Sequence, residues 1–154
     1  MWKKAFPILL LCVLIGGVLV GCGETKNDEP FPSEDVFTSE IRDISVQELQ
    51  DGGYQLEMET VLRNNSDKTY EITGNPTCWN VLYVNGEREA QDLPAGSYTL
   101  QPGGELKETK KIKLTAEEMK TCEFYVLSEF SIAHADGTSQ SYAIRSESKY
   151  PAES

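Results

Sequence analysis

The sequence predicts an all-β fold, and three observations carry this prediction. Apolar and polar residues alternate with a period of two in several short runs, as in strands with one buried face. Clusters of turn-forming residues separate these runs at short intervals. From residue 36 onward, a long apolar pattern of period 3.6, which would indicate an amphipathic helix, is missing. We therefore expect short antiparallel strands in two layers.

Five segments carry the strand pattern: 54–63, 79–84, 111–114, 122–132 and 139–146. The first is the clearest, since its alternate residues on one face are Tyr54, Leu56, Met58, Thr60 and Leu62. Segment 79–84 is apolar at both parities, which fits a central strand. Glu108 and Lys110 break the alternation just before the third segment.

Five turn signals separate the strands: 51–53, 65–67, 85–86, 102–104 and 136–137. Thr115 and Glu118 form the sequence pattern of a capping box, which predicts one helical turn between two strands. Six to eight strands within about 115 residues are typical of an immunoglobulin-like sandwich. We expect about seven strands in a single domain that covers residues 36–150.

The N-terminus has the layout of a bacterial export signal. Lys3 and Lys4 precede an apolar run over 5–20, which is shorter than the roughly 20 residues of a membrane-spanning helix. The run ends in Leu19-Val20-Gly21-Cys22, which resembles the lipobox of bacterial lipoproteins. The resemblance implies that a signal peptide, 1–21, is removed and that the Cys22 sulfur carries a diacylglycerol. Palmitate on the new N-terminus would add a further chain, and more than one chain gives stable anchoring.

Residues 22–35 are polar, contain two prolines and show no apolar period, so we expect a disordered tether. The mature chain keeps 12 of the 14 basic residues and all 25 acidic ones, which gives a formal charge of −13. This charge excludes a nucleic-acid partner and disfavours contact with anionic lipid. We therefore expect the protein to contact the membrane only through the lipid on Cys22, at the extracytoplasmic face of the cell membrane.

The stretch 62–114 resembles the small intracellular proteinase inhibitors of bacteria and immunoglobulin-like extracytoplasmic domains. Both have an Asn-rich turn, an Asn-Gly or Asp-Gly turn and a Pro-Gly turn in this order, here at 64–66, 85–86 and 102–103. The resemblance implies a surface-tethered protease inhibitor as the alternative to a binding or accessory module with an unknown protein partner. It identifies no reactive loop.

Candidate chemical groups each have a structural explanation. His134 and Asp136 share a parity at a strand end, but two ligands do not make a metal site, and no catalytic partner of His134 is evident. Glu57 and Glu59 share a face and are typical of a solvated sheet surface. The basic cluster of Lys107, Lys110, Lys111 and Lys113 is interpreted as a sheet face neutralised by an acidic neighbour. We expect no enzyme activity, metal or cofactor.

Charged residues also predict strand neighbours. The outward faces of 54–63 and 111–114 have opposite signs, so we expect Glu57 and Glu59 to face Lys111 and Lys113 across adjacent strands. The aromatic residues of the predicted domain could form either part of the core or a binding surface. Trp79 and Tyr83 share a parity on one apolar strand, which favours core packing for these two. The others are Tyr98, Tyr125 and Tyr142.

Two cysteines, Cys78 and Cys122, remain once Cys12 is cleaved off and Cys22 is acylated. Paired thiols are usual in exported domains, so a disulfide is expected. Strand order can forbid it: if 79–84 pairs antiparallel with 122–132, the two cysteines lie at opposite ends of the sandwich. An extra strand over 69–73 that reverses the chain would bring them together.

Overall fold

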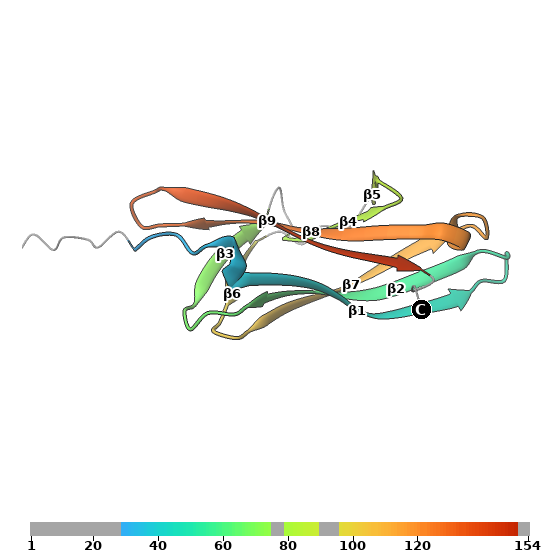
Figure 1. The fold of residues 1–154 in the computed structure, drawn as a ribbon, viewed down its shortest axis with the longest axis horizontal. Helices are drawn as coiled ribbons and strands as arrows, with labels where there is room; N and C mark the ends of the chain where they lie inside the picture. Colours follow the sequence, from blue (N-terminus) through green and yellow to red (C-terminus); the bar gives the residue numbers. More distant parts are fainter. Residues whose placement is uncertain (1–28, 75–78, 90–95, 151–154) are drawn as a thin grey trace, which may run out of the picture. The chain divides into compact units, whose positions relative to one another are not determined.

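The computed structural model describes residues 29–74, 79–89 and 96–150. These residues form nine strands and two short 3₁₀ turns (Figure 1). The elements are η1 (Glu34–Val36), β1 (Phe37–Glu48), β2 (Tyr54–Asn64), β3 (Tyr70–Gly74), β4 (Val81–Val84), β5 (Glu87–Arg88), β6 (Ser97–Leu100), β7 (Glu105–Leu114), η2 (Glu118–Thr121), β8 (Cys122–Ala133) and β9 (Ser139–Tyr150). Among the described residues, no helix is long and apolar enough to cross a membrane.

The strands form two antiparallel sheets. The first sheet has the order β1-β2-β7, and the second has the order β5-β4-β8-β3-β6, with β9 paired to β8. Figure 1 shows the two sheets as layers of a sandwich. With β3 and β4 counted as one main strand and β5 left out, the first, second and fifth main strands form one sheet, and the third, fourth, sixth and seventh form the other. This arrangement is immunoglobulin-like.

β3 and β4 together act as one interrupted strand. β9 pairs with β8 along its whole length, from Cys122 opposite Tyr150 to Ala133 opposite Ser139, so β3 and β4 share the other edge of β8. Ile72 lies opposite Ile132, and Val81 lies opposite Leu127, both in antiparallel register. β3 and β4 therefore run in the same direction along β8. β3 is the extra strand considered above, but the chain does not reverse direction after it, as the disulfide would require. Counted this way, and without two-residue β5, the sandwich has the seven strands expected.

Local sequence explains the turns and one omission. Asn85 and Gly86 both have positive φ, 48° and 86°, which is the two-residue turn that joins β4 to β5. In β1, Asp43 has φ 53° and the pairing register shifts between Arg42 and Ser45. This bulge breaks the alternation of β1, which is why the sequence pattern did not predict that strand.

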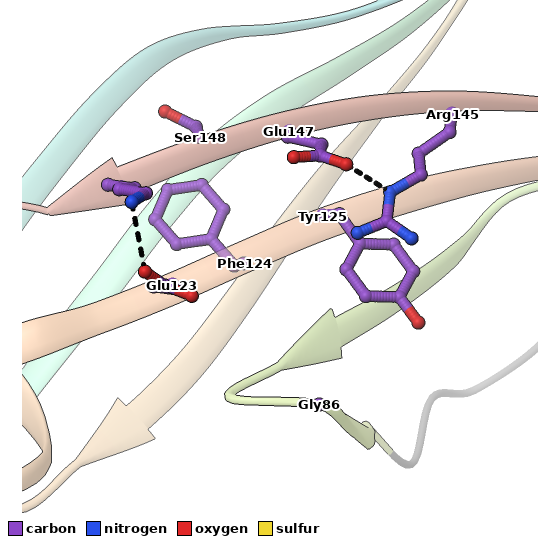
Figure 2. A pocket seen from close by; sticks show the side chains of 8 residues that line it. Gly86, Glu123, Phe124, Tyr125, Arg145, Glu147 and Ser148 are labelled. Atoms are coloured by element: carbon purple, nitrogen blue, oxygen red, sulfur yellow. Dashed lines mark ion pairs between the residues drawn. The ribbon is translucent and has the colours of Figure 1, made fainter.

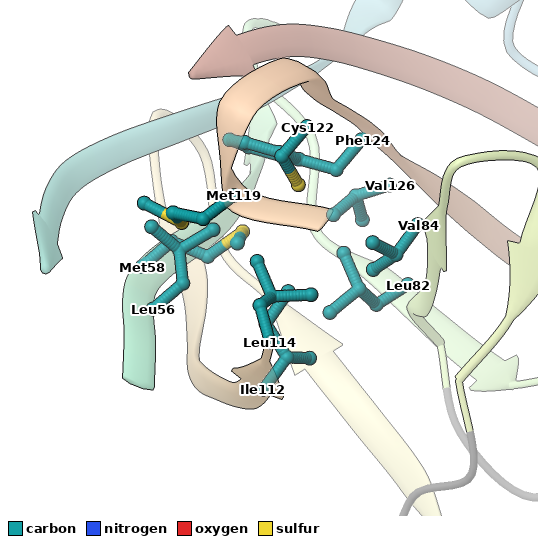
Figure 3. Packing of buried hydrophobic residues seen from close by; sticks show 10 residues of the cluster. All are labelled: Leu56, Met58, Leu82, Val84, Ile112, Leu114, Met119, Cys122, Phe124 and Val126. Carbon is teal, nitrogen blue, oxygen red and sulfur yellow. The ribbon is translucent and has the colours of Figure 1, made fainter. Parts of the chain in front are cut away.

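The core divides into two apolar clusters along the sandwich. The first, shown in Figure 3, consists of Leu56, Met58, Leu82, Val84, Ile112, Leu114, Met119, Cys122, Phe124 and Val126. The second consists of Phe37, Leu62, Ile72, Trp79, Leu100, Phe130, Ile132 and Tyr142. A polar layer separates them in sequence on β2 and β8, where Thr60 and Ser128 are fully buried. Asn80 and Lys110 are buried polar residues of the same layer.

The sandwich begins earlier than predicted. Its compact unit starts at Phe31, whose ring stacks on His134 with centroids 3.7 Å apart. The Tyr142 hydroxyl donates a hydrogen bond of 2.7 Å to the Pro32 carbonyl. Residues 31–35, assigned above to a disordered tether, are therefore fixed by aromatic and hydrogen-bond contacts. The predicted signal segment, 1–21, and residues 22–28 lie outside the described residues.

Candidate functional site

The outer surface of β4, β8 and β9 carries a row of aromatic and charged side chains, which we call the tyrosine–arginine face. It is defined by Tyr83, Glu123, Tyr125, Arg145, Glu147 and Lys149. Strand pairing builds it, because Tyr83 lies directly opposite Tyr125, and Tyr125 lies opposite Glu147. In β8 and β9 the odd-numbered residues point outward here and their even-numbered neighbours face inward. In β4, Tyr83 is partly exposed between the buried residues Leu82 and Val84.

Three of these side chains form a ladder across the strands. The rings of Tyr83 and Tyr125 are stacked, with centroids 4.6 Å apart and planes 9° apart. The guanidinium carbon of Arg145 lies 3.7 Å from the Tyr125 ring centroid, in cation–π geometry (Figure 2). Tyr125 is thus held between a ring and a cation.

A hollow of about 360 Å³ opens on this face, lined in part by Gly86, Tyr125 and Glu147. Arg145 Nε pairs with Glu147 at 2.5 Å, and Lys149 pairs with Glu123 at 3.0 Å (Figure 2). At least half of each of these charged side chains is exposed, so the pairs stabilise the fold little and remain accessible to a partner.

The ladder indicates what this face can bind. Both tyrosines are partly buried, and the stack covers ring surface of Tyr125 that a sugar would otherwise contact. The terminal nitrogens of a guanidinium can still donate to a carboxylate or carbonyl when Nε is engaged. Tyrosine and arginine are the residue types that dominate protein-binding hot spots.

Tyr83 corrects one sequence interpretation. Its shared parity with Trp79 favoured core packing for both, but only Trp79 is buried, at 3% exposed. The strand begins at Val81, so the alternation that points Tyr83 outward does not extend back to Trp79. Tyr98 is partly buried against the second apolar cluster. Tyr142 is buried there, and burial raises its pKa to about 12.

The outer face of the first sheet is charged and compensated internally. Glu57 lies opposite Lys111 and pairs with it at 2.8 Å, as predicted. Glu59 instead pairs with Lys107 at 3.5 Å, because the register places Thr109 opposite it and Lys113 opposite Gln55. The second predicted pair, Glu59 with Lys113, was therefore wrong, because Glu59 pairs with a different lysine.

Glu105 is the centre of this charged face. It forms ion pairs with Arg42 at 3.1 Å, Lys107 at 3.2 Å and Arg63 at 3.5 Å. The hydrogen bonds from Arg42 and then Lys107 lower the pKa of the Glu105 carboxyl, and the same contacts raise the pKa of Arg42 and Lys107. Lys107 and Lys111 of the basic cluster are thus paired with acidic side chains of this face, as expected, whereas Lys113 lies opposite Gln55.

Lys110 does not belong to that face. Its side chain points into the sandwich and is 4% exposed. β7 alternates correctly, with Ile112 and Leu114 buried on the same side, so a lysine occupies a position that an apolar residue would normally take. Sequence reasoning missed it because a charged residue at a core parity looks like a broken pattern.

His134 and Asp136 have structural roles. The His134 ring stacks on Phe31, while the hydrogen bonds from the Thr138 hydroxyl and backbone N–H lower the pKa of Asp136. Within the described residues, no group of three potential His, Cys, Asp or Glu ligands comes together.

The cysteines are only partly described. Cys122, the one cysteine among the described residues, is buried, and burial raises the pKa of its thiol. Cys78 and Cys22, the predicted site of lipid attachment, lie outside the described residues, so the described residues do not test the disulfide. The strand order found is nevertheless the one for which free thiols are expected. Trp79, next to Cys78 in sequence, belongs to the second apolar cluster, and Cys122 belongs to the first.

Comparison with known proteins assigns no family: no family model matches the chain, and no curated protein matches it. Among solved structures, a protein from Archaeoglobus fulgidus is similar over 73% of this chain and 95% of its own, with 10% identity and a TM-score of 0.37. A β-glucosidase from Kluyveromyces marxianus is similar over 74% of this chain (14% identity, TM-score 0.30), and one from Thermotoga neapolitana over 73% (14% identity, TM-score 0.25). The matched parts are only 14% and 16% of those two chains, so these scores carry no functional assignment.

Proposed function

We propose that this protein is a lipid-anchored binding module at the extracytoplasmic face of the bacterial cell membrane, and that the tyrosine–arginine face holds its protein partner. The observation that supports binding is the Tyr83–Tyr125–Arg145 ladder, in which three hot-spot side chains are preordered on rigid strands. The lipobox ending at Cys22 supports the anchoring.

The contrast between the two outer faces supports the choice of surface. On the first sheet the outward side chains around Glu105 are charged and pair with one another. On the second sheet, the exposed charges flank an aromatic row beside a hollow. An aromatic centre with a charged rim is the usual anatomy of a protein interface.

The test uses paired variants of the full-length protein in its own cells. Tyr125→Ala with Arg145→Ala removes the ladder, and Glu57→Ala with Lys111→Ala is the matched control on the other sheet. After chemical crosslinking at the cell surface, the wild type and the control should capture the same partner. The ladder variant should capture about tenfold less, the loss typical of removing a hot spot. Equal capture by both variants would contradict the assigned face.

A surface-tethered protease inhibitor remains the second candidate, supported by the resemblance of 62–114 alone. A panel of proteases assayed with the purified protein separates the two functions. Nanomolar inhibition that persists in the Tyr125→Ala, Arg145→Ala variant would support the inhibitor and replace the binding face proposed here.

A further inference from the structure

The border strand β9 leaves one backbone edge open among the described residues. It covers Ser139–Tyr150, twelve residues, and pairs with β8 alone, without a register shift from one end to the other (Figure 1). β1 of the first sheet approaches β9, but β1 forms its ladder with β2, and no described backbone hydrogen bond joins β1 to β9. Every second residue of β9 directs its N–H and C=O groups away from β8. β9 is therefore a long, regular template for a further strand.

The other borders of the two sheets carry features that oppose such pairing. β1 is interrupted by the bulge at Asp43. β7 has three exposed lysines and directs a fourth, Lys110, inward, while β5 and β6 are only two and four residues long. Bulges, lysines, inward charges and short strands are the means by which natural sheets avoid edge-to-edge association. β9 is long and has no bulge, and its charged residues, Arg145, Glu147 and Lys149, have both signs.

These charges select one way of pairing β9 with a second copy of itself. In an antiparallel pair related by a two-fold axis, residues of the same face lie opposite each other. With the axis at Ser146, Arg145 lies opposite Glu147 of the second copy, and symmetry repeats this pair. An axis at Arg145 or at Glu147 instead places that residue opposite its own copy, and directly opposed like charges are destabilising.

The axis at Ser146 also joins a long stretch, 142–150 of both copies. An axis two residues further on would pair Glu147 with Lys149 but join only 146–150. An axis two residues earlier would place each of the three charges opposite a serine or an alanine. Only the axis at Ser146 therefore combines a long ladder with two ion pairs.

We propose that two copies of this chain associate through β9, antiparallel and centred on Ser146, so that the second sheet of one copy continues into that of the other. Arg145 Nε already pairs with Glu147 of its own chain, and the two side chains are 50% and 66% exposed. The terminal guanidinium nitrogens can donate to the second copy at the same time.

This association goes beyond the proposed binding function, because its partner is the chain itself. Residues of the same face lie opposite each other across the junction, so the tyrosine–arginine faces of both copies lie on the same side of the joined sheet. The dimer would present that face twice to a binding partner.

Disulfide cross-linking tests the register. In the proposed pairing, Ala143 lies opposite Lys149 of the second copy, with Cα atoms about 4.5–5.5 Å apart, which a disulfide can bridge. Within one chain the two positions are about 20 Å apart along the strand, which is too far. The full-length variant Ala143→Cys, Lys149→Cys, oxidised on membranes of its own cells, should therefore give a covalent dimer on a non-reducing gel.

The matched controls are the wild type and the two single variants, Ala143→Cys and Lys149→Cys. Each of them should stay monomeric after oxidation, because no introduced cysteine lies opposite another one. A double variant that stays monomeric, or single variants that dimerise equally well, would overturn the proposal.

Charge reversal on the double-cysteine background tests the ion pairs. Glu147→Arg places arginines opposite each other and should lower the cross-linked fraction about tenfold, since two attractive contacts become repulsive. Adding Arg145→Glu restores opposite charges and should restore the dimer. Lys111→Glu, on the first sheet, should leave it unchanged. Full cross-linking of the Glu147→Arg variant, or a loss that Arg145→Glu does not restore, would overturn the register.

Tyr125→Ala separates this association from the proposed partner binding. The substitution breaks the ladder of the tyrosine–arginine face but keeps the charges of β9. Cross-linking between positions 143 and 149 should therefore persist while capture of the partner falls. Cross-linking that disappears with Tyr125 would show that the ladder joins the two copies, and would overturn the assignment to the β9 edge.

Discussion

At the scale of single residues, Asn64 shows how one buried side chain can hold several loops. Its Nδ2 donates to the carbonyls of Lys68, Leu100 and Gln101 at 2.6, 3.2 and 3.1 Å. Its Oδ1 accepts from the backbone N–H of Ser66 at 2.9 Å and from the Ser66 hydroxyl at 2.7 Å. The end of β2, the turn after it and the end of β6 are thus joined at one amide.

We expect Asn64→Ala to lower the free energy of unfolding by about 2–4 kcal/mol, because it leaves several buried polar groups unsatisfied. Chemical denaturation measures the change. Asn65→Ala, at the exposed neighbour, is the matched control and should change stability by less than about 0.5 kcal/mol. Equal effects of the two substitutions would contradict this role of Asn64.

Glu105 gives a pH-dependent prediction at the same scale. Its folded pKa is lowered from the ordinary 4.5 by Arg42 and Lys107, so its contribution is full above about pH 4.5 and disappears as the pH falls through the folded value. Glu105→Gln should therefore lower the melting temperature at neutral pH, with a smaller difference in high salt. Calorimetry at several pH values checks the sign, and a difference that survives in acid would point to packing instead of charge.

The cysteines give the third prediction. In the denatured, unreduced mature protein, we expect thiol titration to find two free thiols, from Cys78 and Cys122. The reason is the strand order, in which β3 and β4 run in the same direction along β8. In the native protein, Cys122 should react slowly with alkylating reagents, because burial raises its thiol pKa. A titration that finds no thiols would show the disulfide that cysteine number alone favours.

At the scale of elements, periodicity predicted the strands whose pattern is uninterrupted. β2 and β8 alternate as expected, and the Thr115–Glu118 capping box forms in both directions, at 2.7 and 3.2 Å. β1 was missed because its bulge at Asp43 shifts the parity, so no single alternation runs through it. Sequence periodicity shows which residues share a face but not which residue lies opposite which, so one of two cross-strand ion pairs was assigned to the wrong lysine.

The candidate binding face was beyond sequence reasoning for a similar reason. Tyr83, Tyr125 and Arg145 are far apart along the chain, and only the pairing of β4 and β9 with β8 brings them into one row. The position of Tyr83 on the outer face depends on where β4 begins, and an apolar run does not fix its first residue.

At the scale of the whole molecule, anchoring is the property that the lipobox predicts. Cys22→Ala should move the protein from the membrane to the soluble extracytoplasmic fraction, because the variant lacks the thiol that would carry the anchoring acyl chains. Cell fractionation measures this shift, and mass spectrometry of the N-terminal peptide should find a lipid on Cys22 of the wild type. Full membrane retention of the variant, or an unmodified Cys22, would contradict the anchor.

The contacts of Phe31 and Pro32 bear on how such a tethered domain would respond to mechanical force. A pull on the N-terminus reaches Phe31 before β1, and Phe31 and Pro32 are held by His134, which follows β8, and by Tyr142 of β9. Tension therefore passes first into the second sheet, which also carries the tyrosine–arginine face. Once the ring stack and the hydroxyl hydrogen bond break, the load passes to β1, which pairs with β2. The segment that holds Phe31 and Pro32 would therefore detach first under load, and its release would lengthen the tether before either sheet begins to unfold.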